Sequence, residues 1–172
     1  MDKHYLTPLF TPESIVVFAG TADEPASQTS QARTLHEALV AQRYSGRLVF
    51  LDIHNTSGTL ADLAQTGYDL AIIALPPQDV AAALEIAGRM ACRAALVISS
   101  GINGDQAAEL KKIARRESVF LLGPNCLGLQ RPQLQLNASA AGPLAKVGSL
   151  ALVSQSGALT SSILDWASKN GV

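Results

Sequence analysis

The chain has 172 residues, of which 48% are hydrophobic and 16% are charged, and its mean hydropathy is +0.20. This composition is typical of a globular protein and excludes a chain that is disordered throughout. The formal net charge of −1 provides no basic field for nucleic acid or for an anionic membrane, so we expect neither as a partner. Any anionic ligand would have to be held by local groups.

Targeting and redox signals are absent from the sequence. No run approaches the roughly 18 apolar residues of a membrane span, and the N-terminus lacks the apolar core of a signal peptide. Cys92 and Cys126 do not have the spacing of a metal or redox pair. We therefore expect a soluble, cytoplasmic protein with reduced thiols and no metal site.

Short apolar runs alternate with helical patterns over the first 122 residues. The runs are almost continuously hydrophobic, as strands buried on both faces are, and the stretches between them have apolar residues at three- and four-residue spacing. The predicted strands cover Ser14–Ala19, Leu48–Ile53, Asp69–Ala74, Ala94–Ile98 and Val119–Leu122. The predicted helices cover Gln28–Gln42, Pro77–Met90 and Asp105–Arg116. This alternation predicts an α/β fold over residues 1–129, a Rossmann-like parallel sheet with helices on both faces.

The rhythm breaks after residue 129. Residues 130–147 contain two prolines and few apolar clusters, which predicts a linker that crosses to another domain. Beyond it, a strand is predicted over Gly148–Val153 and a helix over Ala158–Lys169. One strand and one helix cannot bury their own apolar faces, so we interpret residues 148–172 as the truncated start of a second α/β domain.

Ligands of open parallel sheets bind beyond the carboxyl ends of the strands, which directs attention to the loops there. After the first strand, Gly20 would let the backbone approach a phosphate, and Thr21 or Ser27 could donate hydroxyl hydrogen bonds. The G-x-G-x-x-G fingerprint is absent, and Asp23 and Glu24 would repel a phosphate. A tight turn and a helix cap explain this loop equally well.

The loops after the second and fourth strands offer different chemistry. Asp52 could bind an adenosine ribose hydroxyl, which keeps a dinucleotide ligand possible, whereas His54 is interpreted as a solvated histidine. Ser99, Ser100 and Gly101 supply hydroxyls and free backbone donors that suit a phosphate or a pantetheine amide. Helix caps and turns use the same residues.

Two further loops follow strands. Within Gly123–Gly128, the amide of Asn125 could hold the turn closed or bind a ligand, while Cys126 is interpreted as a small buried residue. Ser154, Ser156 and Gly157 precede a predicted helix, whose free N–H groups would form an anion site. A plain serine cap accounts for the same pattern.

Taken in order, these stretches resemble the CoA-binding half of the succinyl-CoA synthetase α subunit and of the NDP-forming acyl-CoA synthetases. The matching pieces are Pro12 to Val17, Ala94 to Gly101, Gly123 to Leu129 and Ser154 to Leu159. Two more segments, Leu136 to Ser139 and Ile163 to Ala167, are similar to the bacterial protein lysine acetyltransferases that fuse a synthetase-like region to a GNAT domain.

The resemblance implies a domain that binds CoA or acetyl-CoA, followed by a flavodoxin-like ligase domain, in a parent protein that can also use ATP or ADP. The catalytic histidine loop, the ATP-grasp domain and the GNAT domain of such parents have no counterpart in residues 1–172, so we expect this chain to bind and not to catalyse. Its partners would be a CoA thioester and the remaining domains of the parent.

The chain departs from the family pattern at two loops. The family's further glycine in the first loop is replaced by Ala22 and its neighbours, and the lysine that follows the second strand is missing after His54. Both departures favour a regulatory domain. The alternatives are a module that senses NAD(H) through Asp52 and a structural scaffold without a ligand.

Overall fold

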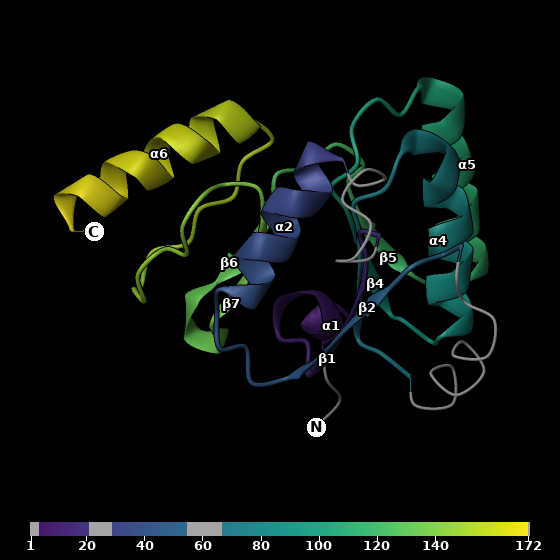
Figure 1. Cartoon of the computed structure of the whole chain (residues 1–172), viewed down its shortest axis with the longest axis horizontal. Helices are drawn as coiled ribbons and strands as arrows, with labels where there is room; N and C mark the ends of the chain where they lie inside the picture. The colour runs from purple at the N-terminus through teal and green to yellow at the C-terminus, as the bar shows by residue number, and fades with distance from the viewer. Residues whose placement is uncertain (1–3, 21–28, 55–66, 172) are drawn as a thin grey trace.

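A computed structural model describes residues 4–20, 29–54 and 67–171. Five parallel strands form one sheet in the order β2-β1-β3-β4-β5 (Figure 1). The strands are β1 (Ser14–Phe18), β2 (Arg47–Leu51), β3 (Leu70–Ile73), β4 (Ala94–Val97) and β5 (Phe120–Leu122). The predicted parallel α/β fold is confirmed. Four strands lie inside the ranges expected for them, and β2 begins one residue before its range, at Arg47.

The order of the strands places a switch point beside β1. Val16 of β1 pairs with Val49 of β2 on one side and with Ala71 of β3 on the other, so the chain leaves β1 in one direction and later returns across it. The crossovers on the two sides of β1 therefore cover opposite faces of the sheet. Ligands of open α/β sheets bind outside the carboxyl ends of the strands at such a point.

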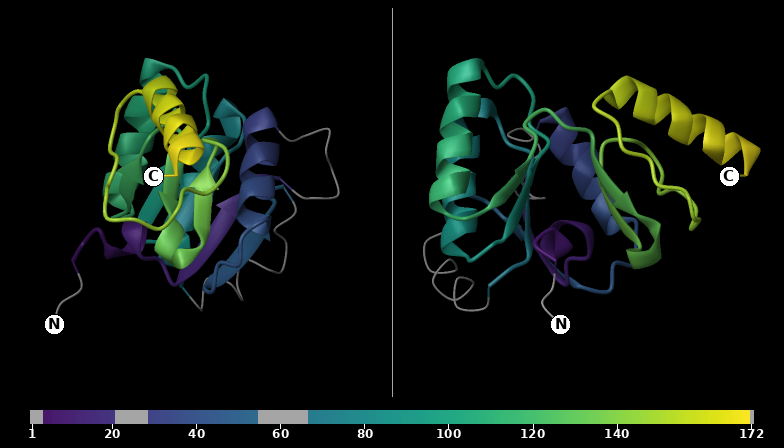
Figure 2. Two further views of the ribbon diagram at one scale, coloured as in Figure 1. Left: turned by 90° about the vertical axis from the view of Figure 1, so that its left-hand side faces the viewer. Right: turned by 180° about the vertical axis from the view of Figure 1, so that it is seen from behind.

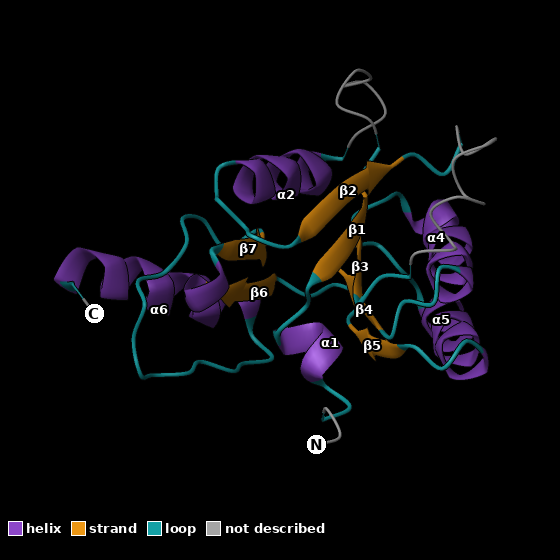
Figure 3. Cartoon of the chain, turned by 90° about the horizontal axis from the view of Figure 1, so that it is seen from below, coloured by secondary structure: helices purple, strands orange, loops and turns teal. Residues whose placement is uncertain are grey.

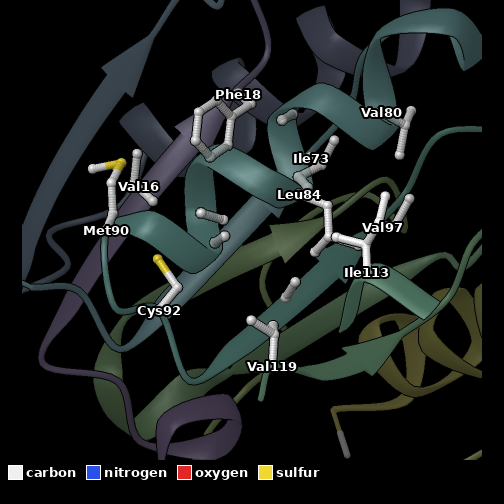
Figure 4. Packing of buried hydrophobic residues seen from close by; sticks show 14 of the residues in the cluster. Val16, Phe18, Ile73, Val80, Leu84, Met90, Cys92, Val97, Ile113 and Val119 are labelled. Atoms are coloured by element: carbon white, nitrogen blue, oxygen red, sulfur yellow. The ribbon is translucent and has the colours of Figure 1, made fainter. Parts of the chain in front are cut away.

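Helices cover both faces of the sheet, and successive side chains along each strand point to opposite faces. Val16 and Phe18 point to the face covered by α4 (Pro77–Arg89) and α5 (Gly104–Arg116), and Figure 4 shows Leu84 and Ile113 meeting there. Ile15 and Val17 point to the other face, covered by α1 (Thr7–Phe10) and α2 (Ser30–Val40). Both faces of β1 are thus fully buried, as its continuous hydrophobic sequence predicts.

Local sequence signals set the starts of these helices. The Thr29 hydroxyl accepts a hydrogen bond from the N–H of Ala32 and caps α2. Pro77 occupies the first turn of α4. Asn103 and Gln106 form a capping box at α5, with each side chain accepting from the backbone N–H of the other residue. All three helices begin at the carboxyl edge of the sheet because each follows a parallel strand.

Residues 130–139, which the sequence predicts as part of a linker, form regular secondary structure. The chain there forms an antiparallel hairpin of β6 (Gly128–Arg131) and β7 (Leu136–Ser139), joined by the short 3₁₀ helix η1 (Pro132–Leu134). Leu136 and Ala138 are fully buried against the face that α2 covers, and the hairpin lies beside α2 (Figure 3). The strand signal in the sequence was weak here, because β7 has only four residues with apolar side chains at every second position. Pro132 nearby favoured a loop instead.

The strand expected over Gly148–Val153 does not form. These residues run without secondary structure, and Leu150 and Val153 are 85% and 93% exposed, because no strand among the described residues lies beside them for pairing. The helix expected next is present as α6 (Gly157–Asn170) and has no buried residue. It lies beyond the hairpin, on the side of the molecule away from α4 and α5 (Figure 2).

Leu136 provides a test of whether the hairpin belongs to the core. Replacing Leu136 with Ala should lower the free energy of unfolding by about 2–5 kcal/mol, because the side chain is fully buried and its removal leaves a cavity. Leu150→Ala is the matched control and should change it by less than about 0.5 kcal/mol, since that side chain is exposed. Urea denaturation measures both. Equal effects would show that the hairpin does not pack as described.

Candidate functional site

The candidate site lies at the carboxyl edge of the sheet, where the chain leaves β1, β3, β4 and β5. Gly20 follows β1, Leu75 follows β3, Ser99 to Gly101 follow β4, and Gly123 follows β5. Helix α2 also begins at this edge. Of the predicted first-loop residues, Gly20 is described with a φ of +76°, while Thr21 and Ser27 lie outside the described residues.

Ser99 lies beneath the loops of this edge and connects two of them. Its side chain is buried, and its hydroxyl oxygen accepts a hydrogen bond from the N–H of Leu75 at 2.9 Å. Its carbonyl oxygen accepts one from the N–H of Asn125 at 3.0 Å. The predicted ligand residue Ser99 therefore fixes the loops after β3 and β5 from below, and it does not face the surface.

Ser100 and Gly101 follow Ser99 in the chain and are exposed. The N–H and the hydroxyl of Ser100 both donate to the side-chain oxygen Oε1 of Gln31, at 3.3 and 3.1 Å. Gln31 belongs to the first turn of α2, so this contact joins α2 to the loop after β4. Nothing in the sequence pattern singled out Gln31, because its partner is 69 residues away.

The turn after β5 is shaped by a close backbone approach at Gly123. Its φ is +101°, and a Cβ atom there would lie 2.3 Å from the carbonyl oxygen of Val97, which requires glycine. The next peptide bond, Gly123-Pro124, is cis. Asn125 follows with a φ of +55°, and its exposed side chain makes no hydrogen bond to another described residue. The carboxamide of Asn125 is therefore available at the edge.

Cys126 anchors the same turn from inside. Its Sγ donates to the carbonyl oxygen of Val97 at 3.2 Å, and burial raises the pKa of the thiol above its usual value. A thiol with a raised pKa is neutral near pH 7 and is a poor nucleophile. The structure thus gives Cys126 the packing role that the sequence predicted.

Charged groups gather on the side of the edge near β2. Asp52 Oδ1 accepts a hydrogen bond from the N–H of His54 at 2.9 Å. The imidazole Nε2 of His54 lies 3.7 Å from Oδ2 of Asp79, in the first turn of α4. The side chain of His54 is 72% exposed, which agrees with its interpretation as a solvated histidine. Asp79 was not singled out from the sequence.

The serine loop before α6 has the geometry of a helix cap. Ser156 Oγ accepts a hydrogen bond from the N–H of Leu159, and Ser154 Oγ accepts one from the N–H of Ser156. A Cβ atom on Gly157 would lie 3.9 Å from the side chain of Leu127, so this loop lies close to the turn after β5. The turn after β5 and the serine loop before α6 are thus brought near each other.

Within the described ranges, no three His, Cys, Asp or Glu side chains are grouped as metal ligands would be. In the same ranges, no helix is both long enough and apolar enough to cross a membrane. Ser100, Asn125 and the backbone provide neutral hydrogen-bond donors at the edge, and those of Ser100 are engaged by Gln31. This chemistry suits amide carbonyl and phosphate oxygens.

Comparisons with known proteins show which domains this chain is similar to. Residues 50–132 match the sequence model described as the CoA binding domain. ADP-forming acetate–CoA ligase I of Archaeoglobus fulgidus is 39% identical over 110 residues, which are 60% of this chain and 16% of that protein. The ADP-forming acetate–CoA ligase of Methanocaldococcus jannaschii is 36% identical over 101 residues, or 56% of this chain and 14% of that protein. The chain thus spans less than a quarter of these relatives.

Solved structures show the same fold. A dinucleotide-forming acetyl-coenzyme A synthetase of Ca. Korarchaeum cryptofilum superposes with a TM-score of 0.78 at 22% identity, covering 97% of this chain and 38% of that one. The protein PH0766 of Pyrococcus horikoshii gives a TM-score of 0.81 at 24% identity, covering 97% of this chain and 40% of that one.

These findings define a Rossmann-like α/β fold, in which residues 50–132 are similar to the CoA binding domain. This domain is similar to the CoA-binding domain of ADP-forming acetyl-CoA synthetases, as the order of the loops predicted.

Gly123→Ala tests the shape of the turn. The added Cβ would collide with the Val97 carbonyl oxygen, and the positive φ would be strained, so we expect a loss of at least about 1–3 kcal/mol in unfolding free energy. Gly104→Ala is the control, because nothing lies within 4 Å of its added Cβ at the start of α5, and it should be neutral or slightly stabilising. Thermal unfolding compares the two variants, and a stable Gly123→Ala protein would contradict this geometry.

Proposed function

We propose that this chain is the CoA- or acyl-CoA-binding part of a larger protein related to ADP-forming acyl-CoA synthetases. The observation that carries the proposal is the match of residues 50–132 to the CoA binding domain, because that segment contains β3, β4, β5 and the loops that follow them. Acetyl-CoA is the thioester that the names of these two relatives suggest.

The carboxyl edge suits the pantetheine arm of CoA. That arm contains two amides, whose carbonyl oxygens need donors such as the N–H and hydroxyl of Ser100. The free carboxamide of Asn125 can donate to the same arm or to a phosphate. Gly20 and Gly101 remain our proposed points of close backbone approach, and Thr21 and Ser27 our proposed phosphate donors.

The charges at this edge favour modest affinity. CoA carries several negative charges, whereas Asp52 and Asp79 lie on the β2 side of the edge and His54 stands where a lysine is expected. We therefore propose a regulatory, ligand-sensing domain, with a protein lysine acetyltransferase as one possible parent and an acyl-CoA synthetase using ATP or ADP as the other. In either parent the chemical steps belong to other domains.

Residues 148–172 are proposed as the start of the second, flavodoxin-like domain. Apolar side chains along this segment are exposed, including Leu150, Val153 and Trp166 at 58% exposure. Such residues are ordinarily buried, so a sheet that pairs with residues 148–153 and packs on α6 would cover them. Ser154, Ser156 and Gly157 would then form a helix N-terminus facing the domain boundary, as a phosphate loop does.

Calorimetric titration with CoA and acetyl-CoA tests the proposed ligand. We expect saturable binding of both and none of NADH, because the G-x-G-x-x-G fingerprint of dinucleotide-binding loops is absent. Asn125→Gly should weaken CoA binding about three- to tenfold, since it removes one ligand hydrogen bond while glycine keeps the positive φ.

The matched control is Asn170→Gly, which removes the same carboxamide at the far end of α6. It should leave CoA affinity unchanged. No heat or thermal shift with CoA at millimolar concentration would refute the proposed ligand, and NADH binding that Asp52→Ala abolishes would favour the dinucleotide alternative.

A further inference from the structure

The carboxamide of Gln31 occupies the two donors that Ser100 offers at the candidate site. One oxygen atom, Oε1 of Gln31, accepts from both the N–H and the hydroxyl of Ser100, at 3.3 and 3.1 Å. Gln31 comes from the first turn of α2 and Ser100 from the loop after β4, so the contact bridges two segments of the edge. An internal group thus fills an acceptor position within the proposed site.

The chemistry of that group indicates what it replaces. Oε1 of Gln31 is a neutral amide carbonyl oxygen, with the same hydrogen-bonding capacity as the carbonyl oxygens of pantetheine. The pair of donors on Ser100 matches one such oxygen. A phosphate oxygen would instead bring negative charge to an edge that already carries Asp52 and Asp79.

The contact is also weak enough to exchange. Both hydrogen bonds lie at the exposed surface and are longer than the usual 2.9 Å, so water and ligand compete with them. Breaking them leaves no buried group without a partner. α2 itself is held independently, by its Thr29 cap and by the burial of Leu35 and Leu39.

We propose that Gln31 is an internal competitor for the pantetheine arm, and that its side chain must leave Ser100 before a CoA thioester can bind there. This inference rests on the proposed function. Gln31 thereby lowers the affinity for CoA and links occupancy of the site to the first turn of α2. Its removal should strengthen binding, which is the opposite of what a residue that positions or contacts the ligand would do.

Gln31→Met provides the test, because methionine keeps the length of the side chain and removes the carboxamide. Calorimetry should show about three- to tenfold tighter binding of CoA and of pantetheine, as expected from freeing two exposed donors. Adenosine 3′,5′-bisphosphate, which lacks the pantetheine arm, should bind with unchanged affinity. Gln42→Met, beyond the opposite end of α2, is the matched control and should change none of these affinities.

A second variant and a second readout keep the outcome decisive. Gln31→Glu should weaken CoA binding, because a carboxylate accepts more strongly from Ser100 and repels the phosphates. In NMR spectra without ligand, the amide proton of Ser100 should shift and exchange faster in Gln31→Met than in Gln42→Met. Weaker or unchanged CoA binding by Gln31→Met, or an unaltered Ser100 amide, would overturn the inference while leaving the proposed function intact. Absence of CoA binding by every variant would refute the proposed function itself.

Discussion

Ser99 is the residue on which the geometry of the carboxyl edge depends. It is buried, and through one hydroxyl and one carbonyl it ties the end of β4 to the loops after β3 and β5. The turn after β5 packs against this junction. Gly123 approaches the carbonyl oxygen of Val97 closely, and Cys126 Sγ donates a hydrogen bond to the same oxygen. Because these bonds are inside, the surface above them is left to Ser100, Gly101 and Asn125.

The central strands β1, β3 and β4 were predictable because both of their faces are buried. Continuous apolar runs such as Ile15 to Phe18 carry that signal locally, and parallel pairing then brings every strand exit to one edge. The candidate loops could therefore be named from the sequence. Which side chains face outward could not, since Ser99 and Ser100 differ only in tertiary contacts that lie 24 to 69 residues away.

The same reasoning explains what the sequence concealed. The strands of the hairpin containing Leu136 are only four residues long, so their apolar pattern is short, and packing beside α2 makes the hairpin part of the core. The apolar run at residues 148–153 is the reverse case. Its sequence pattern strongly predicts a strand, but the described residues provide no strand beside it. A sequence with strand propensity forms a strand only where another strand is available to pair with it. The contact between Gln31 and Ser100 likewise has no local signal.

The account's central claim is that a CoA thioester binds at the carboxyl edge, above Ser99. A two-dimensional ¹H–¹⁵N NMR titration of the chain with CoA tests this claim most directly. We expect the largest amide shift changes at Gly20, Ser100, Gly101 and Asn125. Changes confined to the opposite edge, around Arg47, Tyr68 and Arg93, or no changes at saturating CoA, would contradict the claim.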